Sequence, residues 1–349
     1  MSTQLVIVGC GARTSVGFDR RSSAAAVRAG IASITDHPFM IDRFGEPMKV
    51  ARDASLGPAL TGPERLFELA LSAACEALAP LDGLSTVPKV AAVISLGEER
   101  PGQDRHTGAR LADALCDRLS DKIRVGERSH SMEGHAGGIL AMEAGRRMIV
   151  EGDAELVLAG GTDSYICRDT LEWLDDIEQL HSEGNIYGFC PGEAAGFVLI
   201  ARMETARRLG LAPLVTLVSI GSGIEKNLIK TEDICLGEGL SAALRTAAEA
   251  VRNTATIDRI ICDMNGERYR GNEYGFAVLK ASGLFKNAAA FEAPADCWGD
   301  VGAAAGPLYA GLVIEAEARG YSPGPLSLIW ASSEGGLRAA AILSRWGTA

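Results

Sequence analysis

The sequence predicts an α/β protein, because short apolar strands alternate with helices along the whole chain and small-residue turns join many of them. Residues 134–163 form the clearest unit. Apolar side chains recur there at helical spacing from Ile139 to Ile149, and Gly152 ends the helix. The run 156–159 is apolar throughout, which is typical of a strand buried on both faces. A glycine-rich turn at the helix start would present free backbone N–H groups to an oxyanion or a reactive side chain.

The other elements follow in order, and both halves of the chain share one pattern. In the first half we expect strands at 5–8, 90–96, 121–125 and within 188–200, and helices at 22–30, 63–78, 105–119 and 204–208. In the second half we expect strands at 214–220, 257–262, 326–331 and 338–343, and helices at 240–252, 274–281 and 307–318. Each half begins with a strand, a tight glycine turn (9–11 and 221–223) and a helix, which indicates an internal duplication. We therefore divide the chain into residues 1–210 and 211–349.

Three segments read as surface features. Residues 31–58 contain three prolines and no clear periodicity, so we expect an irregular surface excursion. Residues 173–183 are acidic and expected to be exposed, and residues 98–102 are expected to form a solvated loop. The excursion or the acidic segment could recognise a protein partner in a larger assembly.

The composition excludes several kinds of partner. A formal net charge of −11 argues against nucleic acid or an anionic membrane surface as a bulk partner. The eight cysteines are scattered without a CxxC pair, which favours free thiols in a reducing compartment over disulfides or a metal site. The N-terminus lacks a basic segment, and no apolar run approaches the roughly 20 residues of a spanning helix. We therefore expect a soluble, cytoplasmic protein without a membrane span.

Six stretches, in the same order along nearly the whole chain, resemble the β-ketoacyl synthase branch of the thiolase superfamily. They are VIVGCGARTSVG (6–17), HAGGILAMEAGRRMIVEGDAELVLAGGTDS (135–164), GFCPGEAAGFVLI (188–200), DMNGE (263–267), WGDVGAAAG (298–306) and SSEGGLRAAAIL (332–343). The resemblance implies a five-layer α-β-α-β-α fold of two similar halves, a homodimer, and acyl-CoA or acyl carrier protein as a partner. We expect no metal and no cofactor.

The resemblance also implies a catalytic site. The family uses a thiolate at the start of a buried helix, backbone N–H groups that hold the oxyanion, and two imidazoles that stabilise the enolate. An ungapped alignment of the helix places His135 at the nucleophile position, and a gapped alignment places Ser131 there. The two imidazole positions read Asn265 and Asp300. The family's gate position, a Phe, reads Glu334.

Further positions carry supporting roles. The glycines expected at the turns and the oxyanion site are Gly137, Gly138, Gly335 and Gly336. Glu193 is expected to be a structural carboxylate that accepts backbone hydrogen bonds near the pocket. Arg268 and Arg270 could line the pocket mouth, where a basic pair would meet the phosphate of phosphopantetheine or CoA.

The replaced residues change the expected chemistry. A helix N-terminus disfavours an imidazolium at His135. Asn265 can donate a hydrogen bond to an oxyanion, but it cannot carry a proton. An ionised Asp300 would repel an enolate or a carboxylate substrate. Ordinary Claisen condensation is therefore not expected.

Three interpretations stay open. In the first, the protein has lost condensing activity and acts as a scaffold, a partner subunit or an acyl-group binder. In the second, it is an acyltransferase or hydrolase acting on acyl thioesters, with altered chemistry at His135 and Asp300 or at Ser131. This interpretation requires His135 and Asp300 to lie within hydrogen-bond reach. In the third, His135 is simply a satisfied core or surface residue.

Overall fold

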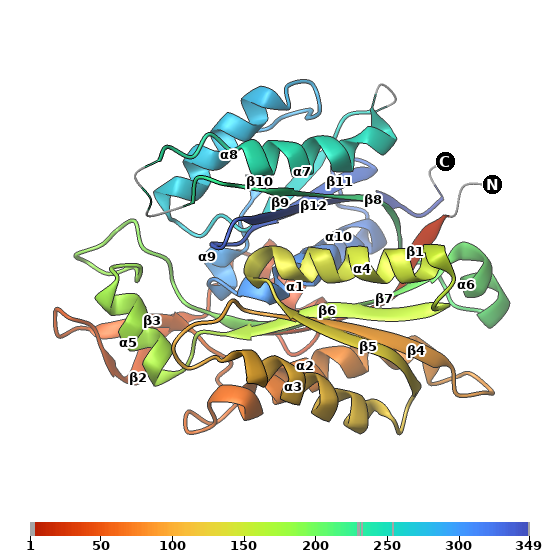
Figure 1. The fold of residues 1–349 in the computed structure, drawn as a ribbon, viewed down its shortest axis with the longest axis horizontal. Coiled ribbons are helices and arrows are strands. Elements are labelled where there is room, and N and C mark those ends of the chain that lie inside the picture. The colour runs from red at the N-terminus through yellow and green to blue at the C-terminus, as the bar shows by residue number, and fades with distance from the viewer. Residues whose placement is uncertain (1–3, 229–230, 232, 253–254, 348–349) are drawn as a thin grey trace.

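Two five-stranded sheets and three helical layers build the molecule. The computed structural model describes residues 4–228, 231, 233–252 and 255–347. Figure 1 shows α4 and α10 between the two sheets, α7 and α8 over the outer face of one sheet, and α2 and α3 over the outer face of the other. The predicted five-layer α/β fold is confirmed.

The first half supplies the elements up to residue 209. Its strands are β1 (Leu5–Thr14), β2 (Ile34–Ile41), β3 (Pro47–Ala51), β4 (Lys89–Leu96), β5 (Arg124–Met132), β6 (Leu156–Ser164) and β7 (Glu193–Arg202). Its helices are α1 (Arg20–Arg28), α2 (Gly62–Leu78), α3 (Arg105–Leu119), α4 (Gly137–Glu151), α5 (Arg168–Asp176) and α6 (Met203–Leu209), with 3-10 turns η1 (Ala79–Leu81) and η2 (Gly134–Ala136).

The second half supplies the rest. Its strands are β8 (Val215–Ile224), β9 (Arg259–Cys262), β10 (Phe291–Glu292), β11 (Leu326–Ser332) and β12 (Leu337–Arg345). Its helices are α7 (Glu238–Ala248), α8 (Arg268–Lys280), α9 (Ala295–Trp298) and α10 (Ala305–Arg319), with 3-10 turns η3 (Glu249–Val251) and η4 (Gly302–Ala304).

The strand order shows that the halves are duplicates. The first sheet runs β5-β4-β6-β7-β1 and the second runs β10-β9-β11-β12-β8. When the strands of each sheet are numbered by their order along the chain, without β2 and β3, both sheets have the same order: third, second, fourth, fifth, first. The pairing directions also agree, since the third, second and fourth strands are parallel and the last two pairs are antiparallel. A short ladder between 5–7 of β1 and 215–217 of β8 joins the two sheets at one corner.

The glycine turns predicted at 9–11 and 221–223 are wrong, because β1 and β8 run straight through them. These glycines instead let a helix approach its strand. A Cβ on Gly9 would lie 2.0 Å from the carbonyl oxygen of Ala77 in α2, and a Cβ on Gly221 would lie 2.3 Å from that of Ala243 in α7. Such distances exclude any side chain, so the repeated glycines mark the same helix-on-strand contact in both halves.

Three other element predictions need correction. The excursion 31–58 is not irregular throughout, since β2 and β3 pair there as a small antiparallel sheet. The strand predicted at 121–125 begins at Arg124 and continues to Met132, because it pairs with the full length of β4. The helix predicted from 274 begins at Arg268. Polar residues at both places hid the periodicity from the sequence pattern.

Three apolar clusters follow the layers. The central one packs α4 and α10 between the sheets, and two outer ones lie under α2 and α3 and under α7 and α8. Within the described part of the chain, the helices are too short or too polar for any of them to cross a bilayer.

Candidate functional site

His135 lies on a fixed turn at the start of the central helix α4. After β5, Gly134 adopts φ +64°, and η2 then leads into α4. Left-handed backbone of this kind favours glycine. His135 itself is 4% exposed, so its ring lies in the protein interior at the junction of the two halves.

The three residues predicted at the catalytic positions meet directly. His135 Nε2 donates to the Asp300 carboxylate, with distances of 2.8 Å to Oδ1 and 2.9 Å to Oδ2. Asn265 Nδ2 donates to Asp300 Oδ2 at 2.7 Å. The backbone N–H of Gly302 donates to Asp300 Oδ1 at 2.9 Å. Asp300 is 4% exposed and is therefore the buried centre of the group.

Arg270 extends this group into an ion-pair network. Its Nη1 donates to Asp263 at 2.7 Å and to the Ser332 carbonyl at 2.8 Å. Its Nε donates to Glu267 at 3.3 Å, and its Nη2 lies 3.2 Å from His135 Nε2. Arg270 is 1% exposed, so the predicted basic pair at the pocket mouth is wrong. Arg268 points elsewhere and stacks over the Tyr187 ring at 3.5 Å.

The network fixes the ionisation of its centre. Burial disfavours the imidazolium of His135, but the charge and hydrogen bonds of Asp300 outweigh burial and raise the pKa of His135 above its usual value. Burial likewise disfavours the Asp300 carboxylate, but His135 and Arg270 hold the pKa of Asp300 well below its usual range. The contact therefore favours the imidazolium form of His135 and the carboxylate form of Asp300, and both side chains are buried.

A second carboxylate, that of Glu98 after β4, binds the turn after β11. Glu98 Oε1 accepts from the backbone N–H of Gly335 at 2.7 Å, and Oε2 accepts from that of Glu334 at 3.1 Å. The Glu334 carboxylate accepts from Gln179 Nε2 at 3.0 Å. The loop predicted to be solvated at 98–102 therefore places its first residue against the site. Burial raises the pKa of Glu98.

A cavity of about 280 Å³ adjoins His135. It is lined by Glu98, Glu99, Arg100, Gly134, His135, Asp163, Tyr165, Trp173, Leu174 and Glu334. None of the eight cysteines, all of which lie in the described part of the chain, lines it. The cavity is thus acidic and has no thiol.

Comparisons with known proteins agree with this geometry. Residues 109–206 match the model of the β-ketoacyl synthase N-terminal domain. A 3-oxoacyl-[acyl-carrier-protein] synthase 2 of Rhizobium meliloti is 29% identical over 168 residues, which are 43% of this chain and 39% of that protein. The chain is a ketosynthase-like protein.

Solved structures support the thiolase-like fold over the whole chain. The ishigamide ketosynthase/chain length factor matches with a TM-score of 0.81 at 19% identity, covering 99% of this chain and 100% of that one. A ketosynthase in complex with its chain length factor from Xenorhabdus doucetiae matches with a TM-score of 0.78 at 16% identity, covering 98% of both chains. At these identities the likeness concerns the fold.

The other predicted positions of this ketosynthase-like chain lie around the site. Ser131 is on β5 and donates to Glu133 at 3.0 Å and to Ser95 at 3.3 Å, so it does not lie at the helix start. A Cβ on Gly137 would lie 2.0 Å from Ser95 Oγ, and one on Gly138 would lie 2.5 Å from the Ala303 carbonyl oxygen. Both glycines are thus required for close packing, and neither lines the cavity.

The turn 333–336 closes around the same helix start. Ser333 Oγ accepts from the backbone N–H of Ala136 at 2.9 Å, which caps one of the donors expected to be free. Gly336 has φ +103°, and its backbone carbonyl accepts from Glu225. The Gly335 N–H donates to the side chain of a cavity residue, Glu98.

Glu193 lies in a separate buried ion pair. Arg65 donates to both of its carboxylate oxygens at 2.5 Å, and the Asp53 backbone N–H donates to Oε1 at 2.7 Å. Because Glu193 is 0% exposed and Arg65 is 1% exposed, this pair ties β7 to α2 and to the segment after β3. The geometry fits the structural role predicted for Glu193.

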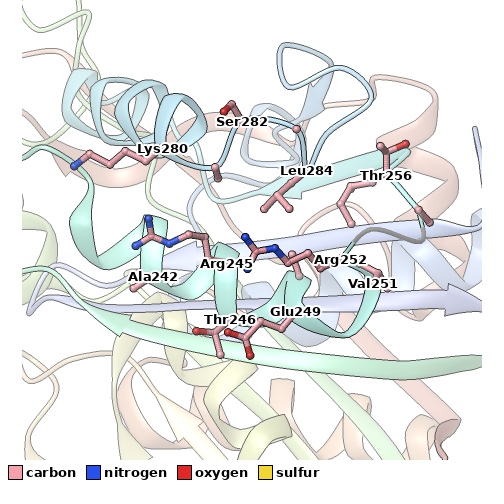
Figure 2. A pocket seen from close by; sticks show the side chains of 15 residues that line it. Ala242, Arg245, Thr246, Glu249, Val251, Arg252, Thr256, Lys280, Ser282 and Leu284 are labelled. Atoms are coloured by element: carbon pink, nitrogen blue, oxygen red, sulfur yellow. The ribbon is translucent and has the colours of Figure 1, made fainter.

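A larger cavity lies on the outer face of the second half. It measures about 950 Å³ and is lined by α7, η3 and the residues after α8 (Figure 2). Arg245 and Arg252 extend into it, but Glu249 lies beside them and two helices end there. Cations at helix C-termini offset the helix dipoles. This explains the arginines without a ligand.

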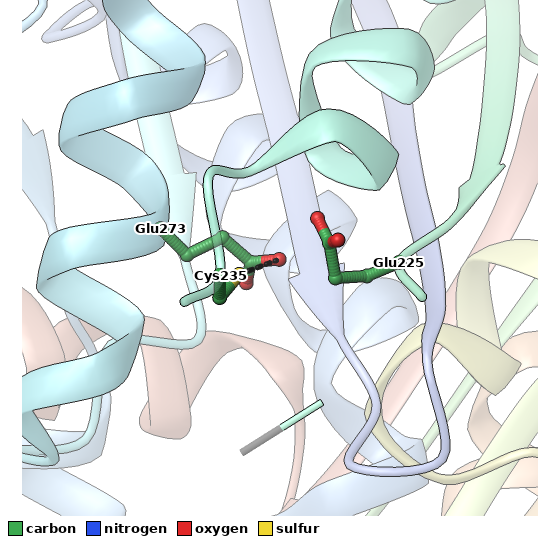
Figure 3. A group of neighbouring side chains, drawn as sticks. All are labelled: Glu225, Cys235 and Glu273. Atoms are coloured by element: carbon green, nitrogen blue, oxygen red, sulfur yellow. Dashed lines mark hydrogen bonds between the residues drawn. The ribbon is translucent and has the colours of Figure 1, made fainter. Parts of the chain in front are cut away.

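A cluster of Glu225, Cys235 and Glu273 has the residue types of a metal site (Figure 3). Its groups already have partners. Glu273 pairs with the buried Arg338 at 2.6 Å, and Glu225 accepts from the Gly239 N–H at 3.0 Å. Burial raises the pKa of the Cys235 thiol to about 11. A neutral thiol beside a guanidinium is a poor cation site.

The sequence motifs did not indicate Glu98 as a member of the site or the place of Arg270 in its buried network. The sequence predicts Arg268 and Arg270 as a pair at the pocket mouth, although their spacing of two places them on different sides of a helix. Glu98 directly follows the buried strand β4 and Gly97. The carboxyl ends of parallel strands are where sites of α/β proteins form, and this position was the available signal.

Proposed function

We propose that this ketosynthase-like protein is a non-condensing subunit that binds an acyl group or a partner protein. The observation that carries the proposal is the buried contact of His135 with the Asp300 carboxylate, which favours the imidazolium, at the position that the ungapped alignment assigns to the family's thiolate. An imidazolium has no lone pair for attack on a thioester. The acidic residues around it also disfavour the carboxylate that decarboxylative condensation consumes.

The described residues that line the cavity also include no cysteine or serine that could replace the family's thiolate. Burial raises the pKa of the thiols of Cys10 and Cys190 to about 12 and about 11, which keeps them neutral. Ser131 lies on β5, where it contacts Glu133 and Ser95, and it is not among the described residues that line the cavity. The free cysteines also suit a reducing compartment, so the proposal includes a cytoplasmic location.

The partner is proposed from the fold and from one exposed sheet edge. Two structural neighbours are described as ketosynthases with a chain length factor, and a third as a ketosynthase in complex with an acyl-carrier protein. In this chain β5 pairs with β4 on one side, and several of its side chains are exposed. A second subunit, in a homodimer or a larger assembly, would cover this edge.

Intact-mass spectrometry tests the proposal. The protein is incubated with acyl-CoA and acyl-carrier-protein donors, alongside His135→Ala and Ser131→Ala variants. We expect no mass increase in any sample, and no release of carbon dioxide when a malonyl thioester is added. A mass increase that disappears in one variant would identify a nucleophile and refute the proposal. Sedimentation of the protein alone tests whether it forms a dimer.

One observation favours an acyltransferase or hydrolase as the second candidate. His135 Nδ1 is buried and has no hydrogen-bond partner among the described residues, while Nε2 is held by Asp300. A neutral ring held this way could act as a base or nucleophile through Nδ1. Because the pKa of His135 is raised, such activity would increase as the pH rises. Thiol release from butyryl-CoA between about pH 6 and 9, lost in His135→Ala, would support it.

A further inference from the structure

The Glu98 carboxylate lies where a ligand oxygen would be expected. It receives two backbone N–H groups from the turn after β11, those of Glu334 and Gly335. The same cavity contains His135, whose positive charge favours the ionised form of Glu98. Two backbone donors and a nearby cation form a site for an oxygen that carries negative charge.

The fit of Glu98 depends on two glycines. A Cβ on Gly134 would lie 2.9 Å from Glu98 Cγ, and a Cβ on Gly335 would lie 2.4 Å from Glu98 Oε1. The side chain therefore passes between the start of η2 and the turn 333–336. Among the described residues, no Arg or Lys forms an ion pair with Glu98 within 4.0 Å. The turn and the helix start hold this carboxylate, with no basic side chain bound to it.

We propose that Glu98 is a built-in occupant of an acyl-oxygen site, and that the ligand it excludes is the carbonyl or carboxylate oxygen of an acyl group. The Glu334 and Gly335 N–H groups can bind either the Glu98 carboxylate or an acyl oxygen, because each N–H makes one strong hydrogen bond. Burial raises the pKa of Glu98, which means that its ionised form is disfavoured in the cavity. A ligand that displaces the carboxylate into water would remove this unfavourable free energy. The inference rests on the proposed function, since it describes binding without condensation.

Three variants isolate the carboxylate. Glu98→Ala removes it, Glu98→Gln keeps its shape and one acceptor oxygen, and the control Glu172→Ala removes a carboxylate that is paired with Arg168 and does not line the cavity. Butyryl-pantetheine and sodium butyrate are the probes. Binding is measured by titration calorimetry, and the amide NMR signals of Glu334 and Gly335 report where the probe binds.

We expect Glu98→Ala to bind butyryl-pantetheine at least about tenfold more tightly than the wild type, with shifts at both amides. Glu98→Gln and Glu172→Ala should bind as weakly as the wild type. Equal binding by wild type and Glu98→Ala, or no binding by a folded Glu98→Ala, would overturn the inference while leaving the proposed function intact. An acyl adduct on Glu98→Ala would instead refute the proposed function and leave the occupant role standing.

Discussion

The starts of α4 and α10 have nearly the same backbone and quite different side chains. The residues before the two turns, Glu133 and Val301, have φ, ψ of −109°, 6° and −115°, 12°. Gly134 and Gly302 follow with φ +64° and +47°, and each leads through a 3-10 turn into a helix of 15 residues. Duplication of the fold thus repeated the turn. His135 occupies its middle position in one half, and the small Ala303 occupies it in the other.

Each half caps the helix start of the other. Ser333, directly after β11, accepts from the N–H of Ala136 at 2.9 Å, while Asp163, at the end of β6, accepts from the N–H of Ala303 at 3.2 Å. β6 and β11 hold the same place in the strand order of their halves. The repeat therefore preserves the turn and a cap supplied by the other half, on different N–H groups, and lets the side chains diverge: His135 joins a polar site and Ala303 packs in the core.

The largest effect is expected from removing the carboxylate that the second half contributes to the polar site at the start of α4. Asp300→Ala leaves His135, Asn265 and the Gly302 N–H without their buried acceptor. Removing one member of a buried ion pair costs about 3–5 kcal/mol of unfolding free energy. Urea denaturation measures the loss. Asp300→Asn, which keeps the shape without the charge, is the matched variant, and a loss below about 1 kcal/mol for Asp300→Ala would contradict a structural ion pair.

The two turn glycines are expected to differ in their tolerance of alanine. A Cβ on Gly302 would lie 2.0 Å from the fixed Asp163 carboxylate, whereas a Cβ on Gly134 would meet the Glu98 side chain at 2.9 Å. Gly152 has φ +92° with nothing within 4 Å of a Cβ, so it measures backbone strain alone. We expect losses of about 1–2 kcal/mol for Gly152→Ala, more for Gly134→Ala and most for Gly302→Ala. A reversed order in urea denaturation would show that the Gly302 turn relaxes.

The sequence pattern predicted the fold because the long apolar elements obey simple periods. α3 occupies the predicted range 105–119, and its N-cap Asp104 accepts from Thr107. The pattern gave a wrong prediction where a glycine allows a distant helix to approach and does not form a turn in its own segment. Gly9 and Gly221 are typical of turns, but each lies inside a strand. Each is a glycine because a helix backbone packs directly against it. Such a contact joins residues more than 20 positions apart and leaves no local signal.

The sequence motifs indicate which residues belong to the site, and the structure shows which of them contact each other. His135, Asn265 and Asp300 could each be placed by resemblance, since each sits in a run with family spacing. Their meeting at 2.7–2.9 Å depends on the two halves packing together. Arg270 shows the limit clearly, because its inward direction follows from the early start of α8 at Arg268. No pattern of charges in the sequence distinguishes a buried arginine from an exposed one.

The unfolding free energy should depend on pH in the direction set by the two pKa shifts of His135 and Asp300. The raised pKa of His135 means that its contribution is complete below about 6.5 and is lost as the pH rises through the folded-state pKa. The lowered pKa of Asp300 means that its contribution is complete above about 3.9 and is lost at lower pH. The pair therefore stabilises most between about pH 4 and 6.5. Urea denaturation at several pH values should show this maximum, and Asp300→Asn should flatten it.

The smallest effect is expected on the exposed face of α4. Arg146 pairs with Glu143 at 2.6 Å, and Arg147 contacts the same carboxylate at 3.3 Å, so either arginine can replace the other. Exposed pairs one helical turn apart contribute about 0.3–0.5 kcal/mol, so Arg146→Ala should cost no more than this in urea denaturation. On α10, Glu315→Ala should cost more, because this buried carboxylate binds both Arg20 and Arg319. Equal losses of unfolding free energy for Arg146→Ala and Glu315→Ala would mean that burial does not make the α10 ion pairs stronger than those of α4. The two helix starts would then differ in energy only through His135 and Asp300.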